Sequence, residues 1–212
     1  MPETQNETPK KAPYHHGDLR ESLILAGRRL LEERGLSGFT LRECARRAEV
    51  SHAAPAHHFA SIDVLLAEIA TRGFGELTAA MASEGKRAAA DPAARLIGQG
   101  VGYMAFAAGN PMLFRLMFNR ETDRFETPAL AAAAKAAREL HFAAIEAAIP
   151  HAPREIKVRT SDFAWATVHG FITLLLERQI GEGESSRTLN ARGLAILADM
   201  AETVMRAGGV PD

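Results

Sequence analysis

The chain has 212 residues, which is enough for one large domain or two small ones with a substantial core. Its 47% hydrophobic content excludes bulk disorder, and its net charge of −1 does not by itself indicate a charged partner. The single cysteine, Cys44, excludes an internal disulfide, and the most apolar run (163–176) is shorter than the ~20 residues of a membrane-spanning helix, so we expect a cytoplasmic protein without a membrane segment.

The N-terminal segment is polar and contains several prolines. We expect residues 1–13 to form a flexible arm. Asp18, followed three residues later by Glu21, forms a capping-box pattern that predicts the start of a first helix at residues 17–19. Gly35 is expected to end this helix, because glycine adopts a left-handed conformation at low cost.

Three residues with short polar side chains predict where the next three helices begin. Thr40 is expected to cap a second helix that runs through Arg47, and Ser51 a third helix that begins at His52. Ser61 is expected to cap a long fourth helix, ending near residue 82, whose apolar residues recur at helical spacing: Leu65, Ile69, Gly73, Leu77 and Met81.

The second half of the chain repeats one helix-start signal. The dipeptides Asp91-Pro92, Asn110-Pro111 and Thr127-Pro128 each place a capping side chain before a proline at the first helical position, where no amide hydrogen is needed. No segment alternates apolar and polar residues over the length of a strand. The sequence predicts about nine helices and an all-α fold.

Residues 40–51 have the pattern of two short helices joined by a tight turn. Small and hydrogen-bonding side chains follow this turn, as expected for a helix that enters the major groove of DNA. Residues 10–60 also carry nine Lys and Arg against six Asp and Glu, a local excess of three positive charges. A surface helical hairpin with incidental histidines is the alternative interpretation.

Residues 14–77 resemble the DNA-binding domain of the TetR family of bacterial regulators. The resemblance is carried by Tyr14-His-His-Gly-Asp-Leu-Arg20, by Thr40-Leu-Arg-Glu-Cys-Ala-Arg-Arg-Ala48, and by the segment from Val50 to Phe59. It implies that Thr40 and Arg42 meet the DNA backbone or the groove edge. It further implies base contacts from Ser51, His52, Ala53 and Ala54, and phosphate contacts from His57 and His58.

Three positions depart from the pattern of this family. Glu49 stands where the turn usually has glycine, so a side chain is expected in a strained backbone conformation that costs about 1 kcal/mol. Ala56 replaces a common tyrosine, and Ile62 replaces a common lysine. Because both replacements remove a phosphate contact, we expect weaker DNA binding with a smaller salt dependence.

Residues 78–212 contain no motif for catalysis, so we expect no enzyme activity and no cofactor. The adjacent pairs His15-His16 and His57-His58 point away from each other on a helix, which disfavours a metal site.

A set of bulky and flexible side chains predicts an apolar chamber for a small molecule in this half of the chain. The residues expected to line it are Tyr103, Phe106, Phe114, Met117, Trp165 and His169. Ordinary core packing is the alternative. The segments 106–118 and 164–177 resemble a TetR subgroup whose C-terminal domain is named for a Trp-His-Gly signature, here Trp165, His169 and Gly170.

The last two helices are expected to form a homodimer interface. Small residues recur on one of them (Ala166, Gly170, Thr173), and apolar residues alternate by three and four on the other (Leu194, Leu197, Ala201, Val204). Packing within the chain is the alternative.

These observations predict a DNA-binding transcriptional regulator, a repressor that a small apolar effector releases from its DNA operator. The expected organisation is an arm at 1–13, a DNA-binding domain at 14–77 and an effector-binding and dimerisation domain at 78–212. The alternative function is an all-α carrier or enzyme that has lost its affinity for DNA.

Overall fold

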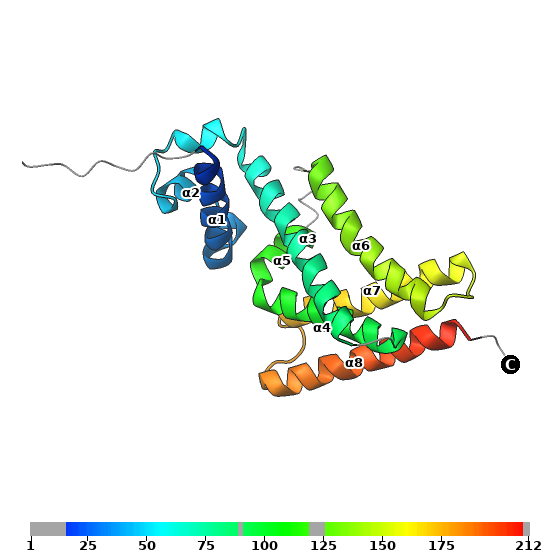
Figure 1. Ribbon diagram of the computed structural model, residues 1–212. Helices are drawn as coiled ribbons and strands as arrows, with labels where there is room; N and C mark the ends of the chain where they lie inside the picture. Colours follow the sequence, from blue (N-terminus) through cyan, green and yellow to red (C-terminus); the bar gives the residue numbers. More distant parts are fainter. Residues whose placement is uncertain (1–15, 89–90, 119–125, 210–212) are drawn as a thin grey trace, which may run out of the picture.

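The computed structural model describes residues 16–88, 91–118 and 126–209, and every regular element in these ranges is a helix (Figure 1). The all-α fold is therefore confirmed, while the predicted arm lies outside the described residues. No helix in these ranges is both long and apolar enough to cross a membrane. In chain order the helices are α1 His16–Arg34, η1 Leu36–Gly38, α2 Leu41–Arg47, η2 Ala54–His57, α3 Ile62–Arg87, α4 Pro92–Gly109, α5 Pro111–Phe118, α6 Pro128–Ala148, α7 Arg154–Leu176 and α8 Ser186–Ala207.

Four of the predicted capping residues are confirmed. Thr40, Ser61, Asp91 and Thr127 each accept a hydrogen bond from a backbone N–H of the first turn, at 3.1 to 3.3 Å. These bonds satisfy amides that have no partner inside the helix, which fixes where α2, α3, α4 and α6 begin. The side chain of Asp18 lies outside the described part of the chain.

The third predicted helix is wrong. Instead of an α-helix that begins at His52, the chain forms only a four-residue 3-10 helix, η2, and Ser51 makes no cap. The reason is Pro55, which has no N–H to donate to the Ser51 carbonyl, where the first α-helical bond would form. The Ser51 carbonyl accepts the N–H of Ala54 instead, at 3.0 Å.

The predicted cap of α5 is also wrong. The side chain of Asn110 turns back to α4, where its Nδ2 donates to the Phe106 carbonyl at 3.0 Å. The first amides of α5 are capped by Glu32, a residue of α1, which accepts the N–H groups of Leu113 at 2.9 Å and Met112 at 3.3 Å. A carboxylate is favoured here because the amino end of a helix carries partial positive charge.

Helix α3 connects the N-terminal helices to the C-terminal bundle, and the predicted domain boundary at residues 77–78 lies inside it (Figure 1). Helices α3 and α4 pack backbone to backbone: a Cβ atom on Gly102 would lie 2.5 Å from the Ala80 carbonyl oxygen. Glycine permits this approach because it has no side chain. In Figure 1, α8 runs along the lower edge of the bundle, beneath α4 and α7.

The predicted dimer stripe on α8 faces the core of its own chain. Leu197, Ala201 and Val204 are buried, and a Cβ atom on Gly100 of α4 would lie 2.2 Å from Leu197 Cδ2. Leu194, the fourth member of the stripe, is 50% exposed. The apolar periodicity correctly predicts a packing face, but three of its four residues pack inside the subunit.

Candidate functional site

The residues predicted to contact DNA lie on the outer surface of the helix-turn-helix. Thr40, Arg42, Ser51, His52, Ala53 and His57 are exposed, while Ala54 and His58 are half-buried. Between them, Pro55 and Phe59 turn inward and are buried. The segment after Val50 therefore presents its polar side chains to solvent and anchors itself by two apolar ones.

Buried side chains hold this segment against α1 and α2. Phe59 is 1% exposed, and the guanidinium of Arg20 in α1 lies 5.3 Å from the centre of its ring. Cys44 is fully buried beneath the turn, and burial raises the pKa of its thiol to about 11. The thiol is therefore protonated at neutral pH and packs as a small apolar group.

Most arginines of the helix-turn-helix form ion pairs with glutamates of the same chain. Glu43 accepts both Arg46 Nε at 2.9 Å and Arg46 Nη2 at 2.7 Å, and it also contacts Arg47 and Arg34. These arginines, Arg46 foremost, lower the pKa of the Glu43 carboxyl to about 2. Arg47 in turn bonds Glu33 of α1 at 2.6 and 2.8 Å. Glu43 therefore joins α1 to α2, a role that its place in the sequence did not indicate.

Arg42 differs from these arginines. It is exposed at the start of α2, next to the cap residue Thr40, and no ion pair holds it within the described part of the chain. Its guanidinium is therefore free to meet a phosphate.

The turn between α2 and η2 has the strain expected from its sequence. Glu49 adopts a φ of 56°, in the left-handed region where a side chain crowds the following carbonyl. Glu49 precedes His52 by three residues and, like His52, is exposed.

The C-terminal bundle contains an apolar inner chamber between α3, α4, α6, α7 and α8. Its free volume is about 20 Å³, room for little more than one water molecule. An outer groove of about 560 Å³ lies between α6 and α7, and the two spaces share His141 and Trp165 as a common wall. The inner chamber is lined by Met81, Leu96, Gln99, Gly100, Tyr103, His141, Ala164, Trp165, Val168 and Met200.

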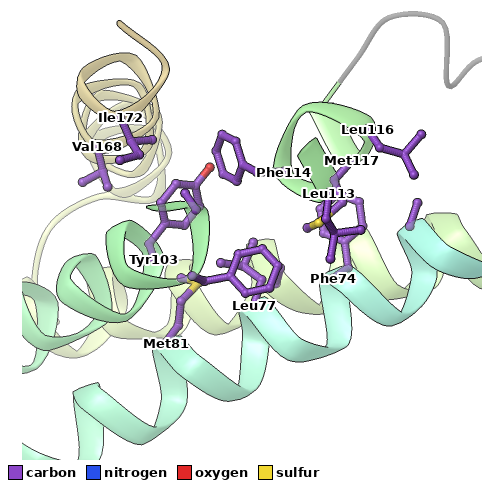
Figure 2. Close-up of a cluster of buried hydrophobic side chains, with 14 of the residues drawn as sticks. Phe74, Leu77, Met81, Tyr103, Leu113, Phe114, Leu116, Met117, Val168 and Ile172 are labelled. Atoms are coloured by element: carbon purple, nitrogen blue, oxygen red, sulfur yellow. The ribbon is translucent and has the colours of Figure 1, made fainter. Parts of the chain in front are cut away.

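The predicted effector-binding residues do not line a single cavity. Tyr103 and Trp165 line the inner chamber, whereas Phe114 and His169 line a separate groove of about 310 Å³ between α5 and α7. Phe106 and Met117 are buried and line neither space. Figure 2 shows Phe114 of α5 beside the hydroxyl of Tyr103, and Met81 of α3 below Tyr103.

A hydrogen bond between Tyr103 and His169 separates the inner chamber from the α5–α7 groove. The Tyr103 hydroxyl lies 2.7 Å from His169 Nδ1, so each satisfies the other. Burial raises the pKa of Tyr103 and lowers the pKa of His169, which keeps both groups uncharged. The rings of Phe114 and Trp165 meet Tyr103 at right or steep angles, with centroids 5.6 and 5.4 Å away.

Gln99 and His141 are two chamber residues that sequence reasoning missed. His141 is 8% exposed, its Nε2 donates to the Ser161 carbonyl at 3.1 Å, and burial lowers its pKa. Gln99 is 5% exposed, and its Oε1 has no hydrogen-bond partner among the described residues. The sequence does contain a signal for Gln99: it is a single amide side chain between Gly98 and Gly100 in an otherwise apolar helix.

Comparison with protein families gives two matches. Residues 23–69 match the family described as bacterial regulatory proteins, tetR family, and residues 96–200 match the Tetracyclin repressor-like C-terminal domain. The Trp-His-Gly subgroup stays a prediction. A search of curated protein sequences gives no match.

Solved structures with this fold cover nearly the whole chain. One is a protein with unknown function from Rhodococcus sp. RHA1, with 30% identity, a TM-score of 0.76, and coverage of 92% of this chain and 98% of that one. Another is a TetR family transcription regulator from Marinobacter aquaeolei VT8, with 17% identity, a TM-score of 0.63, and coverage of 87% and 95%. A third is the TetR family regulator PfmR from Thermus thermophilus, with 16% identity, a TM-score of 0.62, and coverage of 90% and 99%.

Proposed function

Because the chain belongs to the TetR family of bacterial regulators, whose members bind operator DNA as dimers, we propose that it is a cytoplasmic repressor released from its operator by a small apolar effector. The observation that carries this proposal is the outward presentation of His52 and its neighbours on a helix-turn-helix whose apolar side is fully packed. Such a surface has no role in the stability of its own subunit, whereas it fits the edge of a DNA groove.

The predicted DNA-contacting residues divide into two sets by their chemistry. Ser51, His52, Ala53 and Ala54 face the bases, where hydroxyl, imidazole and methyl groups can match donors, acceptors and the thymine methyl. Thr40, Arg42, His57 and His58 face the backbone. Arg42 makes the main charged phosphate contact because it is free of ion pairs, unlike Arg46 and Arg47.

The effector acts through contacts between α1 and the bundle. Arg28 of α1 donates to Glu76 of α3 at 2.7 Å and to Asn110 Oδ1 at 2.8 Å, and Glu32 caps α5. A shift of α4, which lines the chamber, and of α5, which follows α4 directly, therefore moves α1 and, with α3 as the lever, changes the separation of the two recognition segments. A hundredfold induction requires a difference in effector affinity worth ~2.7 kcal/mol between the two states.

The dimer forms through the outer faces of α7 and α8. Phe163 and Leu174 share one face of α7 by their spacing of eleven residues and are 43% and 45% exposed, and Leu194 of α8 is 50% exposed. Gly170 lies on the same face of α7, and a Cβ atom there would meet nothing within 4 Å, which leaves space for a partner helix. The contact thus uses this exposed face rather than the buried stripe of α8.

Operator binding is tested by a gel shift with the duplex DNA upstream of the protein's own reading frame. We expect a specific shift that competitor DNA of scrambled sequence does not remove. Arg42→Ala should weaken binding and lower the slope of log K against log salt by about 2 per dimer, since one phosphate contact is lost per subunit. Arg95→Ala, an exposed arginine of α4, is the matched control and should bind like wild type.

Two outcomes would contradict the proposal. If no specific shift occurs even at low salt, the alternative of a carrier or enzyme on the same fold is favoured, in line with the absence of a tyrosine at Ala56 and a lysine at Ile62. If Arg42→Ala and Arg95→Ala weaken binding equally, the contact is general electrostatic attraction and not docking of this surface.

A further inference from the structure

The inner chamber has a chemistry that selects its ligand. Resting on the proposed function, we infer that the effector is an uncharged compound with an apolar body and one O–H or N–H group, and that Gln99 Oε1 accepts the hydrogen bond from this group. Three features of the chamber support this assignment: its lining has no charged side chain, one of its buried acceptors has no partner among the described residues, and two of its lining residues also line a larger outer groove.

The lining of the chamber has no charged side chain. Of its ten residues, only Tyr103 and His141 titrate, and neither is a Lys, Arg, Asp or Glu. Burial lowers the pKa of His141, so its ring is neutral at physiological pH. A charged ligand would lose its hydration here without gaining a counter-charge, which makes its binding unfavourable.

The polar side chains of the chamber differ in whether they are already hydrogen-bonded. Tyr103 bonds His169 at 2.7 Å, and His141 bonds the Ser161 carbonyl at 3.1 Å. Gln99 Oε1 is buried and has no partner among the described residues. A buried acceptor without a partner is costly, so a ligand that donates a hydrogen bond to it recovers free energy that an apolar ligand cannot.

Packing holds the Gln99 side chain where it is. A Cβ atom on Gly85 of α3 would lie 3.0 Å from Gln99 Cγ, so the stem of the side chain already lies close against the α3 backbone. With its stem held against α3, the amide remains among the residues that line the chamber. The stem of Gln99 is therefore positioned before the ligand arrives, which lowers the side-chain entropy lost when Oε1 accepts the hydrogen bond.

The chamber must enlarge to accept a ligand, because about 20 Å³ is far below the ~300 Å³ of a small-molecule site. Trp165 and His141 separate it from the outer groove of about 560 Å³, so rotation of these two rings joins the spaces. Met81 and Met200 line other parts of the chamber and can adapt to a new shape, because methionine is unbranched. The α6–α7 groove is thus the entrance, and the hydrogen-bonding group of the ligand passes the charged side chains of this groove to reach the uncharged chamber. These charged side chains are Lys135, Arg138, Glu139, Arg154 and Asp162.

Four probes with the same propylphenyl body test the inference: 4-propylphenol, 4-propylanisole, 4-propylbenzoate and 4-propylbenzylammonium. Their binding to the full chain without DNA is followed by calorimetry and by the fluorescence of Trp165, the single tryptophan. We expect the phenol to bind about tenfold more tightly than the anisole, which lacks the donor, and the two charged probes to bind more weakly than either.

The variant Gln99→Met, which keeps a similar shape, should abolish the difference between phenol and anisole by weakening the phenol alone, while Gln179→Leu, an exposed control, should retain it. Equal binding of phenol and anisole to wild type would overturn the inference, as would preference for a charged probe or no binding of any probe. Because DNA is absent, a missing operator complex would contradict the proposed function and leave this result intact.

Discussion

Glu49 lies at the tightest point of the helix-turn-helix, where a side chain occupies a left-handed backbone conformation at φ 56°. Replacement by glycine should relieve this strain and raise the free energy of unfolding by up to about 1 kcal/mol, less the backbone entropy that glycine loses on folding. Chemical denaturation measures the change. The same substitution removes a negative charge beside the proposed DNA surface, so operator affinity should also rise.

Glu49→Gln separates the two effects, because it removes the charge and retains the strained side chain. We expect this variant to match Glu49→Gly in the gain of DNA affinity and wild type in stability. If Glu49→Gln stabilised the fold as much as Glu49→Gly, charge repulsion and not backbone strain would be the cause.

His141 makes the stability of the bundle depend on pH. Burial foremost lowers its pKa below the usual 6.5, although the Ser161 carbonyl and the Asp162 carboxylate oppose this shift. Below pH 6.5 the unfolded chain therefore binds a proton that the folded chain resists, so stability is full above this pH and falls as the pH decreases. The slope is at most about 1.4 kcal/mol per pH unit for one such group.

Thermal unfolding between about pH 7.5 and about pH 5.5 checks this expectation. His141→Gln should reduce the loss of stability at low pH. Part of this loss should remain, because burial also lowers the pKa of His169. The exposed His57→Gln should leave it unchanged. The carboxylate of Glu43 contributes only at lower pH, since its pKa falls from 4.5 to about 2. An unchanged slope in His141→Gln would show that this ring does not stay neutral.

At the scale of the elements, hydrogen bonds join α1 to the turn between α4 and α5 and to the start of α5. Glu32 caps α5, and Arg28 connects α3 to Asn110. Coupling between two sites is reciprocal, so operator binding at the N-terminal helices must also change the bundle. In wild type we expect bound operator DNA to alter amide hydrogen exchange in α5.

Glu32→Ala should remove this response and lower stability by about 1 kcal/mol, the typical loss for a helix cap. Thr127→Ala removes the cap of α6 at a similar cost and touches neither α1 nor α5, so its exchange response should persist. If bound operator DNA still altered hydrogen exchange of α5 in Glu32→Ala, the coupling between the DNA surface and the bundle would run along α3 alone.

At the scale of the whole molecule, the proposed dimer interface on the outer face of α7 and α8 is expected to decide whether two subunits can bind one duplex. Leu194→Glu in combination with Phe163→Glu places unpaired charges at the proposed interface, which should weaken the dimer at least about a hundredfold, or by about 2.7 kcal/mol. Sedimentation equilibrium measures the dissociation constant. Operator affinity should fall in parallel, because a two-fold site needs both recognition segments.

Ala136→Glu, on the exposed side of α6, is the control and should leave the dimer intact. A dimer that persists in the double variant would show that the interface lies on another surface of the subunit.

Much of the fold could be predicted because its signals are local. Thr40, Ser61, Asp91 and Thr127 lie within three residues of the amides that they cap, so their function depends only on neighbours in the sequence. Pro55 is local as well, since the amide that it lacks is enough to keep η2 short. The candidate DNA-contacting residues were predicted from a family resemblance carried by short contiguous segments.

The remaining features could not be predicted, because each depends on groups far apart along the chain. The carboxylate that caps α5 comes from Glu32, some eighty residues earlier, and the chamber around Gln99 forms only where five helices meet. The periodic apolar residues of α8, such as Leu197, correctly predicted a face that would be covered. Such a pattern shows only that a face is apolar, and it does not show whether the same chain or a partner covers it. Local sequence thus set where helices begin and which of their faces are apolar, whereas long-range packing set which faces and polar groups remained without a partner.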